Sequence, residues 1–181
     1  MTNEAPAFGI CLEEYEYPYP VQLFPLSNDL QPLKMAYMDV PPGKEPNGKT
    51  VVLFHGKAFG CYYFRNVIEA LTGAAYRVVA PDQIGWGKSP KPDIHYSFQL
   101  LAANTAALLD HLGVGRVAVL GHSTGGMTAA RSSRGSRAVP GRVPAVSRQP
   151  TRLTARNEPA RWACARPPAT RTSRSHSYWR N

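Results

Sequence analysis

Residues 117–130 read VAVLGHSTGGMTAA and decide the fold. A short apolar run passes directly into Gly121-His122-Ser123-Thr124-Gly125, and small residues follow. A strand, a G-x-S-x-G sequence and a helix start, in that order, form a sharp turn that presents a serine at the carboxyl end of a sheet. We therefore predict that Ser123 is a nucleophile near the positive end of the following helix. The alternative interpretation is a glycine-rich turn whose serine caps the helix.

The neighbours of such a serine must be small, because the nucleophile adopts an unusual backbone conformation and is packed closely on both sides. Gly121, Gly125 and Gly126 meet this need. We predict that all three support the turn.

A second segment, HGKAFG at 55–60, directly follows the apolar run TVVLF. Acyl transfer needs two backbone N–H donors that face the developing oxyanion. Thr124, the residue after the serine, would supply one, and either Lys57 or Ala58 the other. We predict that His55 is structural and holds the loop through hydrogen bonds, in preference to acting as a general base. Gly56 belongs to the same supporting loop.

Outside these segments, apolar runs and helical stripes alternate along residues 1–130. The expected strands are 14–26, 33–40, 50–55, 77–81 and 116–120, and the expected helices are 64–73 and 97–112. Ser97 is the predicted cap of the second helix, and Gly73 and Gly113 the predicted ends of the two. Single helices between strands indicate parallel βαβ units. We predict an α/β fold with about five mainly parallel strands after an antiparallel start.

Residues from about 12 to 130 resemble the N-terminal half of an α/β-hydrolase-fold enzyme. The matching pieces are VVLFHGKAFG, APDQIGWGKSPKP and VAVLGHSTGGMTAA, in the family's order and at its usual spacings. The resemblance implies that Asp82 shapes its loop and is not the catalytic acid. It likewise implies that His122 supports the turn and is not the base.

The resemblance implies a serine hydrolase that cleaves an ester or a related acyl or carbon–carbon bond, with no metal and no cofactor. Serine at position 123 argues against the dehalogenase and epoxide-hydrolase branches of the family, in which the resemblance leads one to expect aspartate at this position. The apolar loops PDQIGWG and KAFGCYYF suggest a small, fairly apolar substrate.

The composition changes after residue 130. Residues 131–181 contain 12 Arg and a single acid, whereas residues 1–130 carry 9 Lys and Arg against 11 Asp and Glu. A segment so rich in Arg, Ala, Ser and Pro buries too little apolar surface to offset its ordering, so we predict disorder. We interpret 1–130 as an incomplete hydrolase core and 131–181 as the product of a frameshift near codon 131. The alternative is a genuine basic tail.

The family order is nucleophile, acid, then histidine. After Ser123 the sequence contains one acid, Glu158, and one histidine, His176, both in the basic segment. We predict that they do not complete a triad and that this chain is inactive, because serine without a base is a weak nucleophile. The run RVAVL would become an exposed sheet edge, so we also expect poor solubility.

Two other interpretations stay open. The arginines could bind nucleic acid nonspecifically through phosphate contacts, or the chain could be a product without a biochemical role.

The sequence contains no run of 18 apolar residues and no secretory signal pattern, and its three cysteines are far apart. We therefore expect no membrane span, no zinc site and a cytoplasmic location. The oligomeric state is left open.

Overall fold

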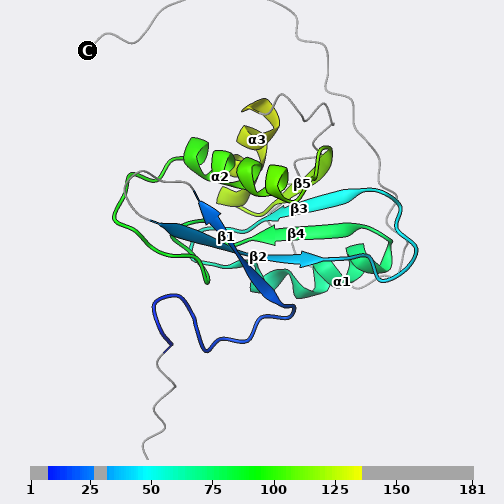
Figure 1. Ribbon diagram of the computed structural model, residues 1–181, viewed down its shortest axis with the longest axis horizontal. Helices are drawn as coiled ribbons and strands as arrows, with labels where there is room; N and C mark the ends of the chain where they lie inside the picture. Colours follow the sequence, from blue (N-terminus) through cyan, green and yellow to red (C-terminus); the bar gives the residue numbers. More distant parts are fainter. Residues whose placement is uncertain (1–7, 27–31, 136–181) are drawn as a thin grey trace, which may run out of the picture. The chain divides into compact units, whose positions relative to one another are not determined.

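The computed structural model describes residues 8–26 and 32–135, with side chains described up to residue 132 (Figure 1). The chain divides into two units, Met1–Arg148 and Gln149–Asn181, and every described residue lies in the first. The predicted disorder, the frameshift and the nucleic-acid binding of the basic segment fall almost wholly outside the described residues. They stay predictions.

A five-stranded sheet forms the centre of the described part, in the order β1-β2-β4-β3-β5. Its strands are β1 (Val21–Leu26), β2 (Leu33–Val40), β3 (Thr50–Phe54), β4 (Arg77–Pro81) and β5 (Val117–Gly121). β2 runs antiparallel to β1 and β4, whereas β3 runs parallel to β4 and β5. The α/β fold with an antiparallel start is confirmed, although the described sheet is mixed and only half of its pairings are parallel.

Helices cover both faces of this sheet, as Figure 1 shows. The short 3-10 helix η1 (Cys61–Phe64) and α1 (Arg65–Gly73) pack on one face, and α2 (Phe98–His111) and α3 (Thr124–Gly135) on the other. β3 is buried throughout because its residues point alternately into two hydrophobic cores, one on each face of the sheet. Val52 and Phe54 face the α2–α3 side, and Val51 and Leu53 face α1.

The predicted helix signals are largely confirmed. The Ser97 side chain accepts a hydrogen bond from the Leu100 N–H at 3.1 Å and caps α2. Gly113 adopts a φ of 64° just past the end of that helix. α1 ends at Gly73 as expected, but the left-handed residue after it is Ala75, with a φ of 68°.

β3 and β5 are neighbouring parallel strands, and they end side by side at the carboxyl end of the sheet. Their register places Phe54 opposite Gly121, so the loop after β3 and the turn after β5 begin side by side. Within the described residues β5 pairs with β3 alone, so β5 is the edge strand that the sequence predicted would be exposed.

In the part of the chain that the structure describes, no helix has the length and the apolar character that a membrane span requires.

Candidate active site

Ser123 lies on the two-residue connection between β5 and α3, and its side chain is exposed. Its φ is 55°, in the left-handed region that residues other than glycine rarely adopt. Hydrogen bonds hold this conformation: the His122 N–H donates to the Phe54 carbonyl at 3.0 Å, and the Gly126 N–H donates to the Ser123 carbonyl at 2.9 Å. Such strain persists only where the surrounding structure fixes it, as it does at functional turns.

Two of the three glycines around Ser123 have no room for a side chain. A Cβ on Gly125 would lie 2.1 Å from the Phe54 carbonyl oxygen, and one on Gly121 would lie 2.4 Å from the Gly125 carbonyl oxygen. A Cβ on Gly126 would be 3.7 Å from its nearest neighbour, an ordinary contact. The close packing therefore depends on Gly121 and Gly125. The expectation that position 126 also needs a small residue was wrong, although the Gly126 N–H supports the turn through the Ser123 carbonyl.

The His55 imidazole is buried and both of its nitrogens are engaged. Nε2 lies 2.9 Å from the Gln83 backbone N–H, which can only donate, so Nε2 accepts. The proton of the neutral ring is then on Nδ1, which donates to the Gly56 carbonyl at 2.9 Å. Burial lowers the pKa of His55 and favours this neutral form. These contacts support the structural role and leave no nitrogen free to take a substrate proton.

The Gly56 carbonyl fixes the orientation of the peptide that follows it. It accepts from His55 Nδ1 and, at 3.3 Å, from the Phe59 N–H. In a planar trans peptide the C=O and the next N–H point in opposite directions. The Lys57 N–H is therefore directed away from His55 and Phe59.

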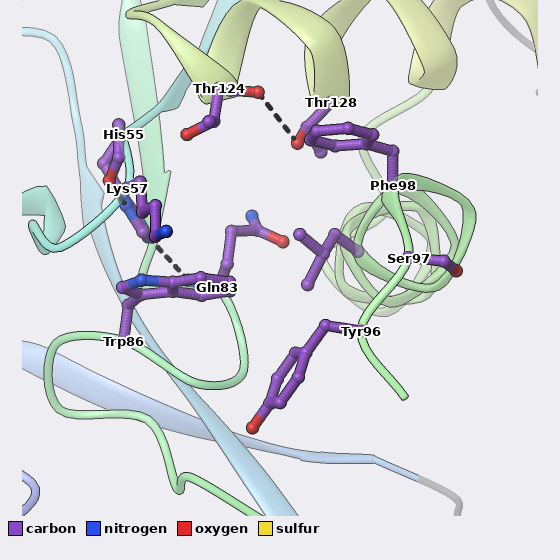
Figure 2. Close-up of a pocket in the computed structure, with 11 residues that line it drawn as sticks. His55, Lys57, Gln83, Trp86, Tyr96, Ser97, Phe98, Thr124 and Thr128 are labelled. Carbon is purple, nitrogen blue, oxygen red and sulfur yellow. Dashed lines mark hydrogen bonds between the residues drawn. The ribbon is translucent and has the colours of Figure 1, made fainter. Parts of the chain in front are cut away.

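Lys57 and Thr124 line one pocket of about 220 Å³ (Figure 2). Ala58, the other predicted oxyanion donor, has a φ of 63° and is not among the lining residues. Within the described residues, neither the Lys57 N–H nor the Thr124 N–H donates to a protein acceptor. Thr124 is the first residue of α3, where helix N–H groups have no partner in their own helix.

Apolar side chains make up much of the pocket wall. Trp86, Tyr96, Phe98 and Leu101 line it together with polar residues that include Gln83, Ser97 and Thr128. In Figure 2, His55, Lys57 and Thr124 lie on one side of the cavity, and Ser97 and Phe98 on the other. Gln83 is held in place because its Nε2 donates to Thr105 Oγ1 at 3.1 Å. Lys57 is the one charged side chain among these lining residues, since His55 is neutral.

Asp82 is fully buried and acts as an acceptor for three segments: the chain before β1, the start of η1 and the loop after β4. Its carboxylate accepts from the Tyr17 hydroxyl at 2.6 Å, from the Cys61 N–H, and from the Lys88 N–H at 2.7 Å. Burial and the nearby Asp82 carboxylate raise the pKa of the Tyr17 hydroxyl and of the Cys61 thiol. This arrangement supports the loop-shaping role that the resemblance implied.

The neutral state of His55 predicts a pH dependence of stability. The unfolded chain takes up a proton near the ordinary histidine pKa of about 6.5, whereas the folded chain does not until its lower pKa is reached. The free energy of unfolding should therefore fall as the pH drops below about 6.5, by up to about 1.4 kcal/mol per pH unit from this group.

Urea unfolding of wild type and His55→Gln between pH 5 and 8 measures this contribution. The variant should be less stable at pH 8 and should lose the additional slope. An identical slope in both proteins would contradict the assignment.

Glu158 and His176 lie outside the described residues, so the prediction that they form no triad stays untested. Among the described residues no group of three or more His, Cys, Asp and Glu side chains lies close enough to hold a metal ion.

Sequence reasoning missed Tyr63 and Gln83. Tyr63 contacts both His122 and Gly56, and Gln83 lines the pocket and contacts His55. Both residues lie in the apolar segments KAFGCYYF and PDQIGWG, Tyr63 within η1, but their partners lie 7 to 59 residues away in the chain.

Comparison with known proteins identifies the family. The alpha/beta hydrolase fold family matches residues 49–146, just over half of the chain. A haloalkane dehalogenase of Mycolicibacterium paratuberculosis is 33% identical over 119 residues, and epoxide hydrolase B of Mycobacterium tuberculosis is 39% identical over 92 residues. These alignments cover 64% and 50% of this chain, and 38% and 25% of the two relatives.

A solved structure supports the same relationship. A probable hydrolytic enzyme from Pseudomonas aeruginosa PAO1 has 51% sequence identity and a TM-score of 0.68, covering 71% of this chain and 41% of that one. The chain thus spans about a quarter to two fifths of the length of these relatives. From its family match, its sheet and its turn after β5, this chain belongs to the α/β-hydrolase fold family.

Proposed function

We propose that this chain carries the nucleophile and oxyanion-binding half of a serine hydrolase site for esters or related acyl or carbon–carbon bonds. The observation that carries the proposal is the left-handed, exposed Ser123 at the β5–α3 turn. Ser123 is not itself a lining residue of the pocket, but Thr124, which follows it directly, lines the pocket together with Lys57. The turn geometry explains why a small polar residue stands there, and exposure leaves its hydroxyl accessible.

Ser123 Oγ would attack the carbonyl carbon of the bound ester and lose its proton to solvent water, and the electrons of the carbonyl π bond would move onto the oxygen. Collapse of this intermediate would break the ester C–O bond and release the alcohol, protonated by water, and a second water would hydrolyse the acyl-enzyme. The carbonyl oxygen gains negative charge in the attack, and two backbone donors would stabilise it. The Thr124 N–H follows the nucleophile directly, and the N-terminal end of α3 adds a favourable dipole. The Lys57 N–H is the better second donor than Ala58, because the Gly56 peptide is fixed and because Lys57 lines the pocket.

The pocket supports a small substrate with an apolar portion. A volume of about 220 Å³ is below the usual range for drug-sized ligands, and the aromatic wall favours an acyl or alcohol group of limited size. The relatives named as epoxide hydrolases and a haloalkane dehalogenase show that the family handles other chemistries. Serine at position 123 is the reason to propose acyl chemistry here.

The sequence predicts that this chain is inactive for lack of a triad, and we propose that any remaining reaction at Ser123 is slow. The sequence after Ser123 offers only Glu158 and His176 as acid and base, and an unassisted serine hydroxyl is a weak nucleophile. When triad members are removed from other hydrolases, substrate binding and the oxyanion donors still provide part of the rate enhancement.

Hydrolysis of short-chain p-nitrophenyl esters tests the proposal. The hydrolysis rate with wild type should exceed the rate in buffer alone, and Ser123→Ala should reduce this excess rate at least about tenfold. Ser132→Ala is the matched control, because Ser132 lies in the same helix and its hydroxyl donates to the Thr128 carbonyl. Equal rates in wild type and Ser123→Ala would refute the proposal.

A further inference from the structure

One hydroxyl joins the two segments that carry the proposed oxyanion donors. Tyr63 Oη accepts from the Gly56 N–H at 3.2 Å and lies 3.0 Å from His122 Nδ1. Gly56 precedes Lys57, and His122 precedes Ser123 and Thr124. The tyrosine therefore contacts the loop after β3 and the turn after β5 at the same time.

The chemistry of the hydroxyl suits this bridge. The Gly56 N–H occupies one lone pair of the phenolic oxygen, and the remaining lone pair and the single phenolic proton are available to His122 Nδ1 in either tautomer. Burial raises the pKa of Tyr63 to about 12, so the hydroxyl keeps its proton over the ordinary pH range. Tyr63 thus accepts from the loop after β3 and shares a second hydrogen bond with His122 Nδ1 in the turn after β5, in which Tyr63 donates when Nδ1 carries no proton.

Ring packing holds the three side chains together. The Tyr63 and His122 rings meet edge to face with centroids 5.7 Å apart, and Phe59 packs against Tyr63 at 5.1 Å. A Cβ on Gly56 would lie 3.0 Å from His122 Nδ1, so the loop and the turn are already in close contact. The contact leaves little freedom for one segment to move without the other.

We propose that Tyr63 is a positioning residue that fixes the loop after β3 against the turn after β5, and so sets the separation of the Lys57 and Thr124 N–H groups. It acts through Gly56 and His122 and does not touch the reacting atoms. The catalytic consequence rests on the proposed function, whereas the contact itself can be tested without activity.

Tyr63→Phe removes the hydroxyl and keeps the ring. The Gly56 N–H then loses its acceptor, and we expect its hydrogen exchange, measured by NMR, to accelerate about tenfold or more. Tyr62→Phe is the matched control: Tyr62 is the adjacent residue, its ring packs against Tyr15 and Tyr17, and Gly56 exchange should stay at the wild-type rate.

The kinetic readout is labelling by a fluorophosphonate probe. Tyr63→Phe should lower the maximal labelling rate about tenfold and leave the half-saturating probe concentration unchanged, because the pocket wall is intact. His122→Ala should lower the rate similarly, and the double variant should be no slower than either single variant. If Tyr63→Phe fails to fold, His122→Ala decides instead. A labelling rate about tenfold below wild type supports the positioning role, and Gly56 exchange and labelling at the wild-type rates overturn it.

The outcomes separate the two proposals. No labelling of wild type would refute the proposed function and leave Gly56 exchange as the test of the contact. Gly56 exchange and labelling that are unchanged in Tyr63→Phe would overturn the positioning role. Loss of stability with unchanged labelling would also overturn it, since it would make Tyr63 a packing residue only.

Discussion

Gly125→Ala should lower the free energy of unfolding by about 3 kcal/mol or more. The added Cβ would lie 2.1 Å from the Phe54 carbonyl oxygen and 2.5 Å from the His55 carbonyl oxygen. Both are backbone atoms, in the last residue of β3 and in the residue after it, so the clash cannot be relieved by turning a side chain. Relief requires α3 to move away from the sheet, which also displaces Ser123.

Gly126→Ala provides the matched control for this substitution. Its Cβ would make only an ordinary contact, 3.7 Å from the Gly121 carbonyl oxygen. Alanine also favours a helix over glycine by about 1 kcal/mol, so this variant should be as stable as wild type or slightly more so. Urea unfolding of both variants measures the difference, and equal midpoints would contradict the described packing of the turn.

Asp82→Ala should cost a similar amount, about 3 kcal/mol or more. The substitution leaves the Tyr17 hydroxyl and the Cys61 and Lys88 N–H groups without their acceptor. The carboxylate is fully buried, so water does not readily replace it. Gly87 shows how closely the loop wraps this group, because a Cβ there would lie 2.1 Å from an Asp82 carboxylate oxygen.

Asp93→Ala is the control for Asp82→Ala, since Asp93 is exposed in the same loop region. Its removal should change the unfolding free energy by no more than about 0.5 kcal/mol. Thermal unfolding followed by near-ultraviolet circular dichroism reports both stability and the packing of the aromatic residues near Asp82. A wild-type melting temperature for Asp82→Ala would mean that the carboxylate does not hold the segments of Tyr17, Cys61 and Lys88 together.

The strands and the elbow turn could be predicted because their signals are local. Apolar runs such as TVVLF and RVAVL lie between helical stripes, and Ser97 and Gly113 delimit α2 as expected. TVVLF is buried throughout, whereas only Val119 of RVAVL is buried. The position of Ser123 between β5 and α3 follows from the same reasoning. These features depend on neighbours within a few residues.

The details of the site depend on contacts that are distant in the chain. The choice between Lys57 and Ala58 depends on how the Gly56 carbonyl is held, and the difference between Gly125 and Gly126 depends on where β3 ends. Tyr63 and His122 are 59 residues apart. No periodicity or short motif contains this information.

The mass of one tryptic peptide tests the central claim most directly. Arg116 and Arg131 delimit the peptide Val117–Arg131, and Ser123 is its only serine. After incubation with a fluorophosphonate, we expect slow formation of an adduct on Ser123, at the wild-type rate in His176→Ala and Glu158→Gln and absent from Ser123→Ala. Faster labelling that depends on His176 would contradict the missing triad. An unmodified peptide from folded protein would contradict the assignment of Ser123 as a nucleophile.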